Sequence, residues 1–563
     1  MKPTKKHPGI SIRKIARIED RATGKYFEVI EFPISDSKTG RLELVPSVIN
    51  DLDAFGKRLR DAGAVLPKDD SKLRSLLTVV AKSDAPEDWI YEAHTGWVER
   101  RRAFVTRSGV IGQPSGKIVG INLANPEDDP SGQLSASGTW RSWRETVAKP
   151  ARDSSILMLA ICLPLAAPLL RIMNRPSFTI CLSSRTRTGK SIATLVGGSV
   201  IGIARSADLI TWNLTDAHLE QRLAEHNDGL FPIDDFMTMR GTDRERYQRI
   251  RGVAYKLTQG WVTGRHESFT KAHKGTHSSW RCIALTSSEK PICAFAKTVK
   301  LEREYGEALR LIDQPAVFDG LDHIFDLLDP ETTAQPPTWK SDAFASIARA
   351  CELNHGKAFE KYIESLIAEE PKVAQYVERR ITGFVGHVCD QFDGDVARDV
   401  AEKYGLIYAG GMLGIRFGLL PWEKRELREA TAKCYRYARE LLPDDGVVLR
   451  RGIQALETRL RSLPTSSSLA KRSVAEGSFK EAEGYRETKV GVYRCRIRCE
   501  VFNSIFSSTS ERDLVLNWLL LEGRITTSVS KTASPTSRSI PKKQFEWPDG
   551  ERHRSFEIHW PRG

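Results

Sequence analysis

A lysine beside a hydroxyl residue stands at a point in this sequence where a triphosphate can be bound. Thr188, Gly189, Lys190 and Ser191 directly follow the apolar run SFTICL at 177–182 and precede the helical stretch IATLVGGSVIG. A strand, a tight loop and a helix N-terminus bring backbone N–H groups and the helix dipole to one point. Lys190 would then reach the β and γ phosphates, and the Ser191 hydroxyl would complete the shell of a Mg²⁺ ion. These residues predict a P-loop site that binds ATP and Mg²⁺.

The loop itself departs from the usual pattern of such sites. That pattern has a glycine at the position of Ser184, and Arg185, Thr186 and Arg187 fill the rest of the loop. A chance GKS triplet is common in a chain of 563 residues, so the motif alone fits a surface loop equally well.

Two adjacent carboxylates follow the next apolar run. Leu230 to Ile233 ends in Asp234 and Asp235, as expected of a strand that emerges at the carboxyl edge of a parallel sheet beside the phosphates. We expect Asp234 to hold Mg²⁺ through water, and Asp235 to orient or deprotonate the attacking water, a role more often given to Glu. An Asp pair in an ordinary turn is the alternative.

A third short strand, Ile283 to Leu285, ends in the polar residues TSSE. Ring-forming ATPases place a polar sensor at such a position, between the two carboxylates and the γ-phosphate. Ser287 or Ser288 fits that role, although short polar residues after a strand are also ordinary turn formers.

Two arginines are candidates for charge stabilisation. Arg310 stands alone on an otherwise apolar run, and a neighbouring subunit of a ring motor supplies such a cation to the γ-phosphoryl group in trans. The alternative for Arg310 is a structural ion pair. Arg398, on a later helical stretch, is a candidate second sensor in contact with the nucleotide, or else part of a solvated helix face.

The elements around these residues predict an α/β core. Helices alternate with short apolar strands over residues 146–335, which is typical of a parallel sheet covered on both faces. Residues 336–462 have helical periodicity, with a break at LLPW, 419–422, and predict an all-α lid.

An α+β domain is predicted to precede the core, over residues 1–145. It has two β-rich runs around a Ser-Lys-Thr-Gly turn, helical stretches near 51–63 and 71–82, and a hairpin around 97–111.

A winged-helix-like domain is predicted at the other end, over residues 484–563. A Ser-rich linker at 463–483 leads to it, and a strand near 492–498, a helix near 511–522 and a basic hairpin follow.

The charge balance favours an acidic polymer as partner. The net charge is +13 and the pI is about 9.2, so DNA is the first candidate. A basic loop at 260–280 and the basic C-terminal hairpin are the expected contacts, with an exposed loop and a protein-docking wing as the alternatives. The residues concerned are Arg265, Lys271, Lys274, Lys531, Arg538, Lys542 and Lys543.

Cysteine usage and hydropathy predict a cytoplasmic protein without a membrane span. The nine cysteines form no paired CxxC motifs, and the N-terminal MKPTKKHPG has no apolar segment of a signal peptide. The most apolar run, 156–170, contains two prolines, falls short of a bilayer span and predicts a buried helix.

Taken in order, these motifs resemble the DUF927 family of predicted helicases from mobile genetic elements. The similar segments are SRTRTGKS, TWNLTDAHLEQRLAEHNDGLFPIDDF, LTSSE, YGEALRLID, and DVARDVAEKYGLIYAGGMLG with GLLPW behind it. The resemblance spans about residues 90 to 440. It implies an AAA+-like core related to superfamily III helicases, a homo-oligomer in the form of a hexameric ring, and a primase or initiator as a partner in trans.

The function predicted from these features is an ATP-dependent helicase or translocase that moves single-stranded or forked DNA. A nucleotide-gated DNA-binding initiator and a defence or regulatory scaffold with a degenerate P-loop are the alternatives.

Overall fold

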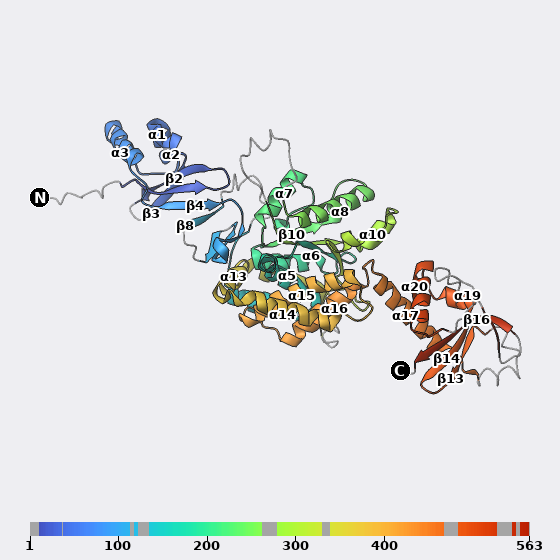
Figure 1. The fold of residues 1–563 in the computed structure, drawn as a ribbon. Coiled ribbons are helices and arrows are strands. Elements are labelled where there is room, and N and C mark those ends of the chain that lie inside the picture. Colours follow the sequence, from blue (N-terminus) through green and yellow to red (C-terminus); the bar gives the residue numbers. More distant parts are fainter. Residues whose placement is uncertain are drawn as a thin grey trace. The chain divides into compact units, whose positions relative to one another are not determined.

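The computed structural model divides the chain into two compact units, Met1–Val388 with Val400–Leu441, and Cys389–Asp399 with Leu442–Gly563 (Figure 1). The fold is mixed α/β, as expected. The residues that the structure describes are 11–35, 38–107, 109–112, 117–121, 134–261, 279–328, 338–466, 482–525, 543–547 and 552–561.

A five-stranded sheet of order β3-β2-β1-β4-β8 forms the N-terminal part of the first unit. Its core contains side chains of β2 and of the two amphipathic helices α2 and α3, among them Phe32, Phe55 and Leu77. The expected β-rich runs, both helical stretches and the hairpin are present. The elements are β1 (Arg13–Asp20), β2 (Lys25–Ser35), β3 (Lys38–Leu44), α1 (Pro46–Asn50), α2 (Leu52–Asp61), α3 (Asp70–Lys82), β4 (Asp88–Glu92), β5 (Gly96–Val98), β6 (Ala103–Thr106), β7 (Gly109–Gly112) and β8 (Lys117–Ile121).

A four-stranded parallel sheet of order β10-β11-β9-β12 lies at the centre of the first unit. The strands are β9 (Phe178–Ser183), β10 (Leu230–Asp235), β11 (Ile283–Ser288) and β12 (Leu311–Pro315). Every residue of β9 and of β11 is buried, as continuous apolar runs require. The first three strands are those expected, whereas β12 has no counterpart among the expected strands.

Helices cover both faces of this sheet. α5 (Ser155–Ile172) and α6 (Lys190–Ile201) pack together on one face. α7 (Asp216–Glu225), α8 (Asp243–Gln259) and α10 (Ile292–Thr298) share a core cluster with Cys181 and Ile233 on the other face. Each strand therefore presents polar groups to solvent only at its ends.

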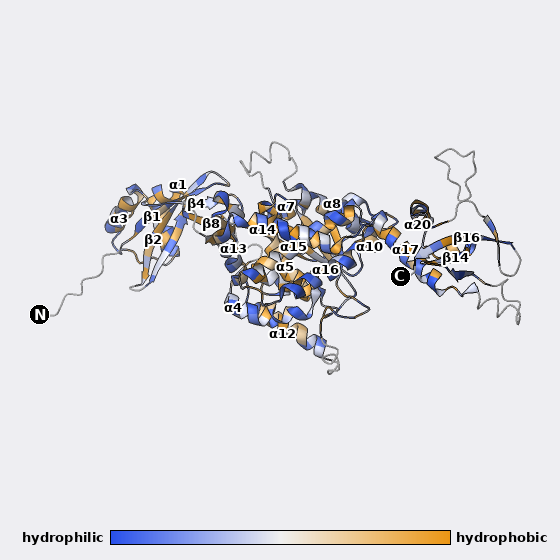
Figure 2. Cartoon of the chain, turned by 60° about the horizontal axis from the view of Figure 1, so that its bottom comes forward, coloured by the Kyte–Doolittle hydropathy of each residue, from blue (hydrophilic) through white to orange (hydrophobic). Residues whose placement is uncertain are grey.

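Helix α5 confirms the buried helix expected over the most apolar run. Among the described residues it is the one helix long and apolar enough to cross a membrane, but 89% of the apolar window is buried inside the protein. Figure 2 shows hydrophobic segments gathered on the strands and on the helices around α5.

The helical region expected after the core is present. It comprises α12 (Trp339–Leu353), α13 (Lys357–Glu369), α14 (Lys372–Val388), α15 (Asp395–Arg416) and α16 (Lys424–Arg439), with the expected break at 419–422 before α16. Two glycines bring α15 against α5, because a Cβ at Gly410 would lie 2.8 Å from the Ala166 nitrogen and one at Gly411 2.5 Å from Cys162 Sγ.

The second unit has an antiparallel sheet of order β13-β14-β16-β15 with helices on one face. The expected strand at 492–498 and the helix near 511–522 are present. Arg450 of α17 donates to Asp390 at 2.8 Å and to Asp393 at 2.7 Å, which ties segment 389–399 to this unit. The elements are α17 (Asp445–Ser462), β13 (Gly484–Thr488), β14 (Val492–Arg498), α19 (Cys499–Ser504), α20 (Thr509–Leu521), β15 (Lys543–Glu546) and β16 (Arg552–Pro561).

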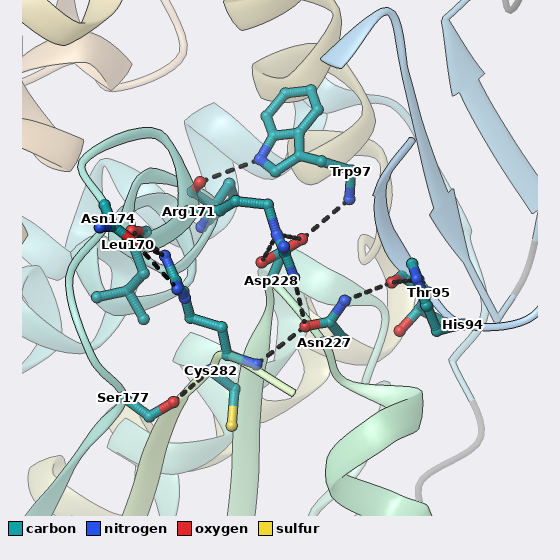
Figure 3. Close-up of polar contacts among 12 residues, drawn as sticks. His94, Thr95, Trp97, Leu170, Arg171, Asn174, Ser177, Asn227, Asp228 and Cys282 are labelled. Atoms are coloured by element: carbon teal, nitrogen blue, oxygen red, sulfur yellow. Dashed lines mark hydrogen bonds and ion pairs between the residues drawn. The ribbon is translucent and has the colours of Figure 1, made fainter. Parts of the chain in front are cut away.

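A buried polar cluster ties the N-terminal part to the central sheet (Figure 3). Asp228, fully buried just before β10, accepts from Arg171 Nε at 2.7 Å and from the Trp97 backbone N–H at 3.0 Å. Asn227 donates to the Thr95 carbonyl at 2.7 Å and accepts from the Arg281 N–H at 2.9 Å. Burial raises the pKa of Asp228, and the Arg171 guanidinium opposes that shift.

Asp228→Ala tests this cluster as an anchor. The change leaves the Trp97 N–H and Arg171 without their acceptor, so we expect the free energy of unfolding in urea to fall by about 2–3 kcal/mol. Asp216→Ala is the control, since Asp216 is 70% exposed in its pair with Lys256 and its loss should cost less than about 1 kcal/mol. Equal effects of the two changes would contradict the anchor role.

Candidate functional site

The loop between β9 and α6 gives the first turn of α6 no side-chain cap. Gly189, at the N-cap position, has φ +112 and provides no side-chain cap for the helix. Ser191 is exposed in the first turn, whereas Lys190 is only 7% exposed. Backbone N–H groups at a helix N-terminus can bind phosphates, and phosphate binding by this loop stays a prediction.

Lys190 folds back across its own loop. Its Nζ donates to the Ser184 carbonyl at 2.7 Å and to the Arg185 carbonyl at 3.0 Å. Burial lowers the pKa of Lys190, while the charges of Asp235 and Glu289 act in the opposite direction. The Lys190 ammonium is thus held by two backbone carbonyls and is favoured by the charges of two carboxylates.

The sheet order brings the predicted carboxylates and the predicted sensor to the loop. β11 lies between β9 and β10, and Asp235 is the register partner of Ser287. Asp235 Oδ1 accepts from the Met237 N–H at 2.9 Å, and burial raises the pKa of Asp235. A carboxyl with a raised pKa is a better proton acceptor than an ordinary Asp.

The end of β10 is fixed through the backbone of Asp234. The Asp234 carbonyl accepts from Trp212 Nε1 at 2.8 Å and from Thr286 Oγ1 at 2.7 Å, which leaves its half-buried carboxylate for other partners. Sequence reasoning missed both donors, although the buried tryptophan in TWNLTD was a signal that the segment packs beside the acidic strand.

The two candidate sensor serines differ in the hydrogen bonding of their hydroxyl groups. The Ser288 hydroxyl donates to the Lys290 carbonyl, whereas Ser287 is 3% exposed and makes no side-chain hydrogen bond within the described part of the chain. Glu289, which sequence reasoning did not assign, accepts from Thr186 Oγ1 at 3.1 Å and links the end of β11 to the loop.

Arg310 lies at the amino-terminal ends of the parallel strands, whereas the loop of Lys190 lies at their carboxyl ends. Its carbonyl accepts from the Thr179 N–H at the start of β9, while the loop follows the end of that strand. The guanidinium donates to the Gly306 carbonyl at 2.5 Å and lies over the Tyr255 ring at 4.6 Å. The structure therefore does not bring Arg310 to the loop of its own chain.

Arg398 belongs to the second unit. Its Nε donates to the Asp393 carbonyl and its Nη2 to the Asp390 carbonyl, both at 3.1 Å. These bonds hold the segment before α15, and a contact of Arg398 with nucleotide stays a prediction.

Most of the predicted nucleic-acid contacts lie outside the described residues. These are Arg265, Lys271, Lys274, Lys531, Arg538 and Lys542, while Lys543 begins β15 opposite Ser555. On β14, Arg494, Arg496 and Arg498 alternate with the core residues Cys495 and Ile497, but Arg494 pairs with Glu487 and Arg496 with Glu557. The alternation places the arginines on the sheet face turned away from the helices.

An Mg²⁺ ion would take its protein ligands from few side chains here. No group of three or more His, Cys, Asp or Glu side chains suited to a metal is found in the described ranges. An Mg²⁺ ion in a P-loop site is held by a hydroxyl, one or two carboxylates, phosphate oxygens and water. The exposed Ser191 and the half-buried carboxylates of Asp234 and Asp235 fit that donor set.

Comparison with known families identifies the N-terminal half of the chain. Residues 8–276 match the model of the domain of unknown function DUF927. The chain carries a DUF927 domain. The match confirms the resemblance, although it begins before the first motif that carried the resemblance and ends before β11.

A solved structure described as SCCmec type IV Cch, an active helicase, has a similar fold over nearly the whole chain. The TM-score is 0.51 at 17% sequence identity, with 98% of this chain and 93% of that chain covered. No curated protein matches the chain. The DUF927 chain and the helicase therefore share a fold.

Gly189→Ala tests the packing of the loop. A Cβ there would lie 2.7 Å from Ile324 Cδ1 and 2.9 Å from Phe344 Cε1, at φ +112. Gly320→Ala is the matched control, because Gly320 has φ +78 and nothing within 4 Å of its Cβ position. We expect Gly320→Ala to lower the free energy of unfolding by about 1 kcal/mol and Gly189→Ala by at least about 1 kcal/mol more, measured in urea. Equal losses would show that Ile324 and Phe344 do not confine the loop.

Proposed function

We propose that this DUF927 protein is an ATP-dependent DNA helicase or translocase of a mobile genetic element. The observation that carries the proposal is the meeting of Lys190, Asp235 and Ser287 at one edge of a parallel sheet, beside an uncapped helix N-terminus. The fold shared with an active helicase supports the choice of this class among P-loop ATPases.

Each residue at the site has a separate role in the proposed hydrolysis of ATP. Lys190 exchanges its two loop carbonyls for the β and γ phosphates, and the N–H groups of Thr188, Gly189 and the first turn of α6 surround them. Ser191 and Asp234 would hold an Mg²⁺ ion, which would neutralise charge on the phosphates. Asp235 accepts the proton of the attacking water, and Ser287 contacts the γ-phosphate from between the two strands.

Completion of the site requires a second subunit. Arg310 lies at the far edge of its own sheet, so it reaches a phosphate only across an interface between copies. We propose a homo-oligomeric, hexameric ring whose subunits have an AAA+-like core, a lid of α12 to α16 and a winged-helix-like second unit. The second unit and the basic loop at 260–280 would contact DNA.

ATP turnover by the purified protein, measured as phosphate release with and without single-stranded DNA, tests the proposal. We expect DNA to stimulate turnover, and Lys190→Ala and Asp235→Asn each to lower it by about 100-fold or more, through lost phosphate stabilisation and lost proton transfer. Lys297→Ala, on an exposed position of α10, should leave turnover unchanged. Turnover that persists in Lys190→Ala, or is indifferent to DNA, contradicts the motor.

A mixing experiment tests the role of Arg310. Arg310→Ala and Lys190→Ala should each be inactive as pure proteins. Mixing them in equal amounts should restore about a quarter of the wild-type rate, because random assembly pairs an intact lysine with an intact arginine at about one interface in four. Each variant is first shown to assemble as the wild type does. An active Arg310→Ala protein, or a mixture without recovery, contradicts a finger supplied in trans.

A nucleotide-gated DNA-binding initiator is the second candidate. The observation that favours it is the altered loop, in which Ser184 replaces glycine and the carbonyls of Ser184 and Arg185 hold Lys190. ATP-dependent assembly on DNA without turnover or strand separation would identify this function instead.

A further inference from the structure

An aromatic cluster beside the phosphate loop has no part in the chemistry described above. Its members are His323, Phe325, Trp339 and Phe344, from the segment after β12 and the start of α12. The Phe325 and Phe344 rings are stacked with centroids 5.4 Å apart, and the His323 and Trp339 rings meet edge to face at 5.1 Å. Trp339 and Phe344 are only half-buried, so part of this aromatic surface is open.

Direct contacts join the cluster to the loop. The Ile324 N–H donates to the Thr188 carbonyl at 3.1 Å. Gly189 faces Ile324 and Phe344 so closely that a Cβ would lie under 3.0 Å from both side chains. We call Ile324 and the four ring residues the aromatic flank.

The sheet order separates this flank from the charged side of the site. On one side of β9 lie β11, which Glu289 follows, and β10, which ends in Asp234 and Asp235; on the other side lies β12. The segment that follows β12 leads into the aromatic flank. Carboxylates suit a metal and a reacting phosphate, whereas a heterocyclic base gains from contact with aromatic rings.

We propose that the aromatic flank is the platform for the base of the nucleotide whose phosphates occupy the loop. The inference rests on the proposed function, since it assumes phosphates at Gly189 and Lys190. The base stacks on the open parts of Trp339 and Phe344, and Ile324 fixes the distance between these rings and the loop. Trp339 and Phe344 then determine affinity for the nucleoside, while Lys190 determines affinity for the phosphates.

Three polar side chains among the described residues of this region have partners within the protein. His323 Nδ1 accepts from the Phe325 N–H at 3.3 Å, Ser341 donates to the Thr338 carbonyl at 2.7 Å, and Lys340 pairs with Asp322 at 2.5 Å. Burial lowers the pKa of His323, which favours the neutral form of its ring. The rings of the flank offer stacking, which reads no hydrogen-bond pattern of the base.

Calorimetric titration of the full chain with Mg-ADP and Mg-pyrophosphate tests the platform, because only one of these ligands carries a base. We expect Trp339→Ala and Phe344→Ala each to lower the affinity for ADP by about tenfold and the affinity for pyrophosphate by less than about twofold. Trp339→Phe retains an aromatic face and should restore ADP affinity to within about threefold of wild type. Lys190→Ala should lower the affinity for both ligands.

Trp89→Ala is the matched control, since Trp89 is a half-buried tryptophan on the distant strand β4 with Lys117 at 4.2 Å from its ring. Thermal melting identifies any variant that fails to fold, and the Trp339→Phe comparison then decides the question. Equal loss of ADP and pyrophosphate in the Ala variants, or ADP affinity unchanged by both, overturns the platform while leaving the phosphate site intact. A wild-type protein that binds neither ligand overturns the proposed function itself.

The same titration with GDP tests recognition by stacking. We expect GDP to bind within about tenfold of ADP, because both purines present a similar aromatic face. A GDP affinity lower by much more than this would show that polar groups read the base, and would overturn stacking as the mode of recognition.

Discussion

The parallel pairing of β10, β11, β9 and β12 is the constraint on which the rest of the first unit depends. A sheet buried on both faces needs apolar helices against it, and α5 meets that need with a nearly continuous hydrophobic sequence. α5 must in turn be covered, and the glycines of α15 allow that helix to approach its backbone. With both faces closed, polar residues of the strands can act only at the strand ends. The loop of Lys190, the carboxylates of Asp234 and Asp235 and the candidate sensor Ser287 therefore lie at the carboxyl ends of the strands.

The opposite edge of the sheet has a different use. There the Asp228 cluster binds the N-terminal part of the unit. Arg310, directly before β12, packs its guanidinium on the Tyr255 ring of α8. The Asn227–Asp228 pair lies just before β10. A shift of the N-terminal part would therefore displace β10, which ends in Asp234 and Asp235. Because the two edges are separated by the length of the strands, roughly 13–20 Å, Arg310 and Lys190 of one chain cannot meet.

Local patterns in the sequence predicted what depends on local physics. The apolar runs that became β9, β10 and β11, the helix after Lys190 and the acidic pair all follow from hydropathy and short motifs. β12 escaped prediction because it is short and contains Asp313, whose charge is buried only with the help of Arg303 and two backbone N–H groups. The Asp228 cluster and the aromatic flank escaped because their residues are far apart in sequence and ordinary one by one. The periodicity around Arg398 predicted one helix, but no local pattern marks the point where α15 passes from one unit to the other.

The loop without its usual glycine shows how side chains can replace backbone freedom. The Ser184 and Thr188 hydroxyls are 2.5 Å apart and Thr188 also donates to the Arg185 carbonyl at 3.0 Å, so small polar side chains fasten the two ends of the loop. Arg185, Thr186 and Arg187 are all exposed, and their bulk does not fill the space inside the loop. Arg187 has φ +63, a left-handed conformation that costs a non-glycine residue about 1 kcal/mol or more. Since the hydrogen bonds at the loop's ends hold this conformation, bulky residues in the motif are compatible with a phosphate-binding backbone, provided that they point outward.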